Sequence, residues 1–150
     1  MRQRGFTLVE LMVVLAVAMV LLAVSVPSFF STTARARLEG AVNELAIDLQ
    51  YARSEAVRER AAVTLAVSAN GGGYTITNAT ATIKTVSLPR GVALSPSATV
   101  AYDALRGMAA ATSIDGTVSG LSGAVRVSTN ALGRVLVCSP SGAVGGYPTC

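Results

Sequence analysis

The chain has 150 residues, of which 51% are hydrophobic and 13% are charged; its formal charge is +4 and it contains no histidine. This length fits one modest domain plus an anchor, and so low a charge content is unusual for a fully soluble domain. The lack of histidine excludes Ser-His and Cys-His nucleophiles, and two cysteines alone do not make a zinc site. We therefore expect no enzyme, no metal and no cofactor.

The N-terminal segment has the pattern of a membrane anchor. Residues 1–5 are short, polar and basic, and residues 6–26 are then apolar with Glu10 as the single ionisable side chain. A helix of this length rises about 30 Å, which matches the hydrocarbon core of a bilayer. Because basic residues before a span favour a cytoplasmic N-terminus, the rest of the chain is predicted to lie on the outer side of the membrane.

Two simpler interpretations of this segment fit less well. A secretory signal peptide has a shorter apolar core that is followed by a small-residue cleavage site, whereas this run continues into an amphipathic helix. An ordinary single-span anchor fits the length but leaves Glu10 unexplained, because an unpartnered carboxylate inside a membrane is costly. Glu10 is therefore interpreted as a functional residue that needs a cation from elsewhere.

Residues 27–62 are predicted to continue the anchor as an amphipathic helix. Apolar residues recur at steps of three and four and form one stripe: Leu38, Val42, Leu45, Leu49, Ala52 and Ala56. Charged residues of both signs lie mostly off the stripe, as expected for a solvated helix face. The stripe is therefore expected to pack against the domain that follows.

Residues 63–150 are rich in strand-forming residues that Gly, Pro, Ser and Asn clusters interrupt. The predicted strands are 63–68, 74–78, 82–88, 92–94, 99–102, 124–128 and 134–138, while 106–123 has no clear pattern. Short strands at this spacing predict a small antiparallel β-sandwich. The predicted fold class is α+β, with a long N-terminal helix, half transmembrane and half amphipathic, packed on that sandwich.

Cys138 and Cys150 are the two cysteines and lie close together near the end of the chain. In a domain outside the cytoplasm, such a pair is expected to form a disulfide. The alternative is a pair of free thiols in a reducing compartment. Closing so short a loop would stabilise the fold by about 3 kcal/mol at most.

The stretch from Arg4 to Leu11 resembles the prepilin cleavage motif of type IV pilins and type II secretion pseudopilins. The resemblance implies that prepilin peptidase cuts after Gly5 and that Phe6 is then N-methylated. It also implies that Glu10 meets the free amine of a neighbouring subunit during assembly. The implied localisation is the inner membrane, single-pass with the C-terminal domain in the periplasm, and a filament or the cell surface after assembly.

The phrase Ala52-Arg53-Ser54-Glu55-Ala56 is similar to the helix-to-strand junction of the GspH/FimT family of minor pilins and pseudopilins. Membership implies a minor pilin of a type IV pilus that acts in filament assembly or at its tip, with other pilin or pseudopilin subunits as partners. The first alternative is a minor pseudopilin of a type II secretion system. The cysteine pair favours the pilus, because a C-terminal disulfide loop is similar to that of type IV pilins.

The second alternative is a DNA-binding minor pilin for natural transformation. Some FimT-like proteins carry a C-terminal Gly-Arg-x-Arg element whose arginines bind DNA, and the matching stretch is Gly133-Arg134-Val135-Leu136. Strand alternation would place Arg134 and Leu136 on one face, so leucine removes one charge from that face. Arg126 and Lys84 are the candidates to compensate, and Arg134 and Arg126 are the predicted DNA-binding residues.

Overall fold

The computed structural model describes residues 7–142 and 144–150, without the side chains of residues 24–28. The leader, Gly5 and Phe6 lie outside the described residues. The element order is α1 (Leu8–Glu59), β1 (Val63–Val67), β2 (Gly73–Thr77), β3 (Thr82–Ser87), β4 (Val92–Ser95), β5 (Thr99–Tyr102), β6 (Thr112–Val118), β7 (Val125–Thr129) and β8 (Val135–Cys138). The chain divides into two compact units, Met1–Thr33 and Ala34–Cys150.

The first unit contains the N-terminal part of α1, which begins with a side-chain cap. The backbone N–H of Glu10 donates to Oγ1 of Thr7 over 3.2 Å, and the N–H of Leu11 donates to the carbonyl of Thr7. A threonine followed three residues later by glutamate is the sequence signature of a capping box. Glu10 therefore lies in the first turn of the helix.

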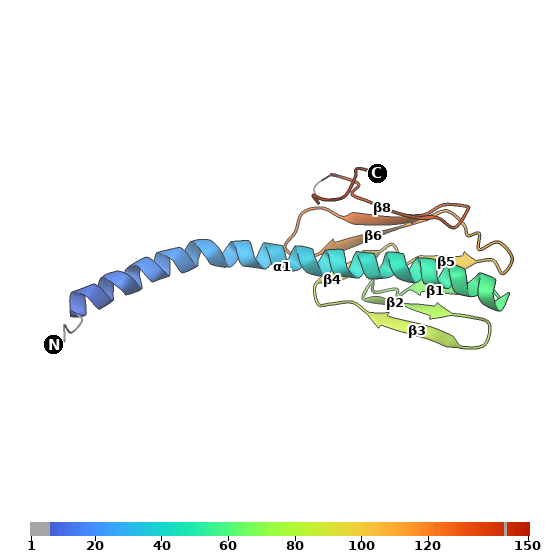
Figure 1. Ribbon diagram of the computed structural model, residues 1–150, viewed down its shortest axis with the longest axis horizontal. Coiled ribbons are helices and arrows are strands. Elements are labelled where there is room, and N and C mark those ends of the chain that lie inside the picture. The colour runs from blue at the N-terminus through green and yellow to red at the C-terminus, as the bar shows by residue number, and fades with distance from the viewer. Residues whose placement is uncertain (1–6, 143) are drawn as a thin grey trace, which may run out of the picture. The chain divides into compact units, whose positions relative to one another are not determined.

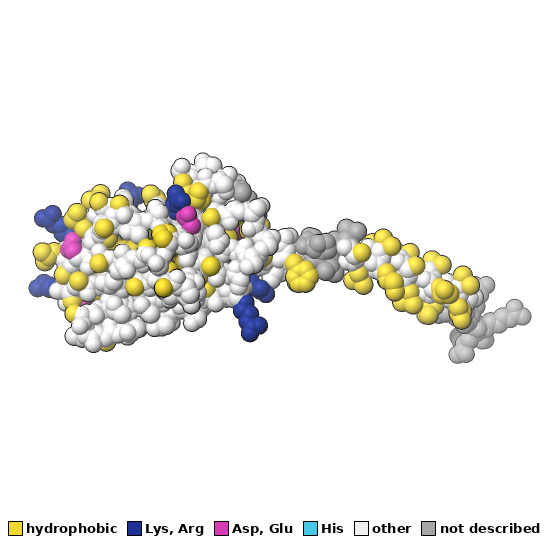
Figure 2. Space-filling model, turned by 180° about the vertical axis from the view of Figure 1, so that it is seen from behind, with side chains coloured by type: hydrophobic (Ala, Val, Ile, Leu, Met, Phe, Trp, Pro, Cys, Tyr) yellow, Lys and Arg dark blue, Asp and Glu magenta, His cyan; other side chains and the backbone are white. Residues whose placement is uncertain are grey.

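The described large apolar side chains of this unit are exposed, and Figure 2 shows hydrophobic side chains along the coloured part of the segment. Within residues 7–142 and 144–150, no helix is both long and apolar enough to cross a membrane. Phe6 and the side chains of residues 24–26, which belong to the predicted span 6–26, lie outside that description.

The second unit holds the strands in two four-stranded antiparallel sheets, with orders β3-β2-β1-β5 and β4-β6-β7-β8. In the first sheet, Leu65 of β1 lies opposite Ile76 of β2 and Val100 of β5. In the second sheet, Asp115 of β6 lies opposite Arg126 of β7. Figure 1 shows the part of α1 that belongs to this unit running along both sheets.

The core of this unit forms between α1 and the inward faces of both sheets. Every residue of the predicted apolar stripe is fully buried: Leu38, Val42, Leu45, Leu49, Ala52 and Ala56. They belong to one hydrophobic cluster with strand residues such as Leu65, Ile76, Ile114 and Val127. The predicted α+β architecture, a long helix packed on antiparallel strands, is confirmed.

A buried carboxylate fastens α1 to the first sheet. The hydroxyl of Tyr74 donates to Oδ2 of Asp48 over 2.7 Å, and Nζ of Lys84 donates to the same oxygen over 2.7 Å. Lys84 also donates to Glu44 over 3.1 Å. Burial, followed by the hydrogen bond to Asp48, raises the pKa of Tyr74. Lys84, one of the two cations expected to compensate for Leu136 in DNA binding, is thus engaged within the fold.

The C-terminal segment is closed by a disulfide. Cys138, at the end of β8, is bonded to Cys150, with 5.0 Å between their Cα atoms. Ser139 is buried beside the bond, and its N–H donates to the carbonyl of Pro148 over 2.8 Å. The predicted pairing is confirmed, and the alternative of two free thiols is wrong for this structure.

One strand was not predicted. β6, Thr112–Val118, lies in the stretch without a clear sequence pattern and forms the centre of the second sheet with β7. Its inward residues do alternate, as Ile114, Gly116 and Val118, but glycine in the middle hides the pattern. A Cβ at Gly116 would lie 2.7 Å from Cγ2 of Val42 and 3.2 Å from Cδ1 of Leu38, so α1 approaches the strand closely there.

We therefore expect Gly116→Ala to lower the free energy of unfolding by about 1–3 kcal/mol, since overpacking a dense core forces neighbours out of place. Denaturant titration of residues 34–150 measures this change. Gly40→Ala is the matched control, because Gly40 lies in α1 with nothing within 4 Å of its added Cβ. That variant should gain up to about 1 kcal/mol from helix propensity. Equal effects of the two substitutions would show that close approach at Gly116 is unimportant.

Candidate functional site: an arginine-lined pocket

The second unit carries a surface pocket with a volume of about 620 Å³. Its lining, which we call the arginine pocket, consists of Gln50, Arg53, Ser54, Val57, Arg106, Gly133, Arg134 and Val135. The residues come from α1, from the turn after β5, and from the start of β8 with the turn before it. None of these eight described residues is acidic, so the pocket is electropositive.

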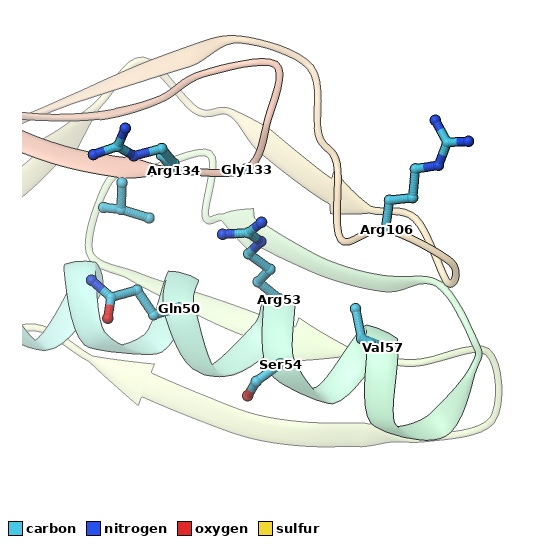
Figure 3. A pocket seen from close by; sticks show the side chains of 8 residues that line it. Gln50, Arg53, Ser54, Val57, Arg106, Gly133 and Arg134 are labelled. Atoms are coloured by element: carbon cyan, nitrogen blue, oxygen red, sulfur yellow. The ribbon is translucent and has the colours of Figure 1, made fainter.

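Arg53 is the half-buried cation at the centre of this arrangement. Its Nε donates to the carbonyl of Gly107 over 3.1 Å. Figure 3 shows the guanidinium groups of Arg53 and Arg134 above α1, with Arg106 at the other end of the pocket. Both Arg106 and Arg134 are exposed. Three positive charges around one depression suit an anion with more than one negative group.

Two glycines let the turns approach Arg53. Gly107 and Gly133 have positive φ angles of 60° and 73°, which disfavour other residues. A Cβ at Gly133 would lie 2.1 Å from the carbonyl oxygen of Gly107 and 3.0 Å from Nε of Arg53. The two turns and the arginine are therefore packed against one another.

An aspartate organises the first turn. The Asp103 carboxylate accepts hydrogen bonds from the backbone N–H groups of Leu105 over 2.7 Å, Arg106 over 2.8 Å and Met108 over 3.2 Å. These bonds, that of Arg106 first, lower the pKa of Asp103. The turn that carries Arg106 is therefore stabilised by the charged form of Asp103.

An asparagine organises the second turn in the same way. Oδ1 of Asn130 accepts hydrogen bonds from the N–H of Leu132 over 3.0 Å and from that of Arg134 over 2.9 Å. The N–H of Gly133 donates to the carbonyl of Asn130 over 2.8 Å. Aspartate and asparagine favour such turns because their short side chains bond to the backbone two residues on.

Acid is expected to loosen the first turn. A lowered pKa means that the contribution of Asp103 to stability is present above the ordinary aspartate pKa, about 3.9, and is lost as pH falls through the lowered value. Asp103→Ala should therefore destabilise residues 34–150 at neutral pH and flatten the acid dependence. Asp103→Asn, which keeps one acceptor, should lose less. Denaturant titrations at neutral and acidic pH test this, and identical acid dependence in the wild type and Asp103→Ala would refute it.

The predicted DNA-binding residues separate in the structure. Arg134 lines the arginine pocket, but Arg126 pairs with Asp115, with Nε–Oδ1 and Nη2–Oδ2 distances of 2.7 and 2.8 Å. Leu136 is exposed on β8 but is not among the described residues that line the pocket. Arg134 precedes β8 and belongs to the turn, so strand alternation does not group it with Leu136.

Sequence reasoning missed Arg53 and Arg106 as partners of Arg134. Arg53 lies off the apolar stripe, on the helix face expected to be solvated, and Arg106 falls in the stretch without a clear pattern. Two signals in the sequence point to these turns. Asp103 precedes Leu105-Arg106 by two residues, and Asn130 precedes Leu132-Gly133-Arg134 by two residues. They indicate tight turns, although they do not indicate that the turns meet.

The fold combines a long, capped helix, two antiparallel sheets packed against it, and a C-terminal segment that a disulfide closes. These features define a type IV pilin-like protein. Two family models match the sequence: Type II transport protein GspH over residues 41–142, and the prokaryotic N-terminal methylation motif over residues 1–26. The chain belongs to the GspH family. Structural proteins of this pilin-like kind are generally not enzymes.

Among solved structures, the chain is similar to the type IV minor pilin FimU of Pseudomonas aeruginosa in two crystal forms. The first has a TM-score of 0.59 and 25% identity, and the match covers 70% of this chain and 90% of that chain. The second has a TM-score of 0.56 and 24% identity, with coverages of 66% and 90%. No curated protein sequence matches the chain.

Proposed function

We propose that this protein is a minor pilin of a type IV pilus that acts in filament assembly or at the filament tip. The observation that carries the proposal is the similarity to FimU, a type IV minor pilin, across 90% of that chain. The disulfide between Cys138 and Cys150 supports it, in line with the expectation that a C-terminal disulfide loop favours the pilus.

In this proposal the precursor enters the inner membrane with residues 1–5 in the cytoplasm and residues 63–150 in the periplasm. Prepilin peptidase removes the leader after Gly5, and Phe6 becomes the methylated N-terminus. Residues 6–26 hold the subunit in the bilayer until it is extracted into a filament. The match of residues 1–26 to the N-terminal methylation motif supports this sequence of steps.

Glu10 is proposed to guide assembly. Its position in the first turn of α1 places a carboxylate near the N-terminal end of the helix. In an apolar bundle that carboxylate needs a cation, and the free amine of a neighbouring, axially shifted subunit can supply it.

The alternative is a minor pseudopilin of a type II secretion system. The match of residues 41–142 to the family Type II transport protein GspH supports this alternative. Deleting the gene and restoring it on a plasmid distinguishes the two. If the protein is a minor pilin, the deletion should remove surface pili and leave type II secretion intact. Normal piliation with failed secretion would instead assign the protein to the secretion system.

DNA binding is the second alternative, and Arg134 is the residue that supports it most. Its companions in the arginine pocket are Arg53 and Arg106, whereas Arg126 and Lys84 are held by Asp115 and by Asp48 with Glu44. A DNA role would therefore depend on a different set of arginines from the set predicted from sequence.

A further inference from the structure

We propose that the arginine pocket and the two leucines beside it, Leu105 and Leu132, form a docking surface for another pilin-like subunit. The partner segment would carry carboxylates flanked by aliphatic side chains. The inference rests on the proposed function, because it gives a site and a chemistry to the contact between filament subunits.

Charge complementarity identifies the carboxylates. Arg53, Arg106 and Arg134 line the pocket together with the uncharged polar side chains of Gln50 and Ser54. Arginine binds carboxylates through two parallel N–H donors, and it is enriched at the centres of protein interfaces. A segment with aspartate or glutamate side chains supplies the missing negative charge.

The exposed leucines identify the aliphatic part. Leu105 is 84% exposed and Leu132 is 59% exposed, and each directly precedes a residue that lines the pocket, Arg106 and Gly133. Val57, within the lining, is 44% exposed. Exposed apolar side chains next in the chain to the residues of a cationic depression are typical of an interaction surface that combines apolar and polar contacts.

The backbones of the two turns are fixed before any partner arrives. Asp103 and Asn130 fix the backbones of the two turns, and the turns pack together where Gly133 meets Gly107. Because the backbones of the turns are already fixed, only the exposed side chains must be ordered on binding, which lowers the entropic cost of docking. The backbone positions from which Leu105, Arg106, Leu132 and Arg134 project are therefore held at fixed spacing.

A protein segment fits this surface better than nucleic acid does. Single strands are held largely by aromatic side chains that stack on bases, and none of the eight lining residues is aromatic. Duplex DNA needs a series of phosphate contacts, whereas Arg126 and Lys84 are occupied by acidic partners. Phosphates would also leave Leu105 and Leu132 without apolar contacts.

Site-specific photo-crosslinking in the full-length chain, in cells that carry its filament system, tests the proposal. A photoreactive amino acid replaces Leu132 in one strain and Leu136 in another. Leu136 is the matched control, since it is 55% exposed, four positions away and outside the pocket lining. We expect crosslinking to a pilin-like subunit at least fivefold stronger from position 132, within a segment that mass spectrometry shows to contain Asp or Glu.

Charge reversal then tests the chemistry. Arg106→Glu combined with Arg134→Glu should reduce the crosslink at least tenfold, and Arg90→Glu, an exposed control outside the lining, should not. Changing the mapped partner carboxylate to arginine should restore the crosslink to the doubly reversed chain. Thermal melting of each purified full-length variant verifies that it is folded.

Three results would overturn the docking surface. They are equal crosslinking from positions 132 and 136, no loss on charge reversal, or a mapped segment without carboxylates. A salt-sensitive gel shift of a 30-nucleotide probe that charge reversal abolishes, without any subunit crosslink, would assign the pocket to nucleic acid. A subunit crosslink in cells whose sheared pili lack the protein would refute the pilus proposal and leave the docking surface standing.

Discussion

Replacing Glu10 with alanine is expected to reduce incorporation of the subunit into filaments at least tenfold while cleavage after Gly5 continues. Removing one partner of a buried ion pair typically costs about 3–5 kcal/mol, and each 1.4 kcal/mol is a factor of about ten in an equilibrium. The loss arises because the neighbour's amine is left without a counter-charge in an apolar bundle. Cleavage should continue because the scissile bond is intact.

The measurement compares the protein in sheared filaments with the protein in whole cells, together with the mass of the mature chain. Glu10→Gln, which has the same shape without the charge, should fail like alanine, and Glu10→Asp should retain part of the function. Normal amounts of Glu10→Ala in sheared filaments would contradict the assigned role of the carboxylate.

Replacing both Cys138 and Cys150 with serine is expected to lower the free energy of unfolding by up to about 3 kcal/mol, as for other short loops. The bond closes a loop with a sequence separation of 12. The loop is also held by the buried side chain of Val144 and by Arg35, whose Nη2 donates to the carbonyl of Gly145 over 2.5 Å. These contacts should keep the fold intact in the serine variant.

Denaturant titration of residues 34–150 measures the loss, and reduction of the wild-type disulfide should reproduce it. A reducing agent should have no effect on the serine variant, which serves as the control. A change below about 1 kcal/mol would show that the remaining contacts alone define the loop.

The helix and most strands could be predicted because their signals are local. The apolar stripe from Leu38 to Ala56 has the helical period, and all of its members are buried. β6 escaped prediction because Gly116 occupies a core position that carries no apolar side chain, and the reason for the glycine, the approach of α1, is a tertiary contact. Local patterns do not report such contacts.

The arginine pocket was predicted only in part, for the same physical reason. The sequence identifies Arg134 because the stretch that contains it resembles the Gly-Arg-x-Arg element. Arg53 and Arg106 come from distant parts of the chain and carry no such motif. Arg126 carries the same charge, yet its cross-strand neighbour Asp115 pairs with it. Net charge is visible in a sequence, but pairing depends on register and on which turns meet.

The central claim is that this chain is a processed filament subunit, and mass spectrometry of the N-terminus in sheared filaments tests it most directly. The account predicts a mature chain in the filament fraction that begins at N-methylated Phe6. A chain that still begins at Met1, or one that is absent from filaments when the same cells assemble them, would contradict it.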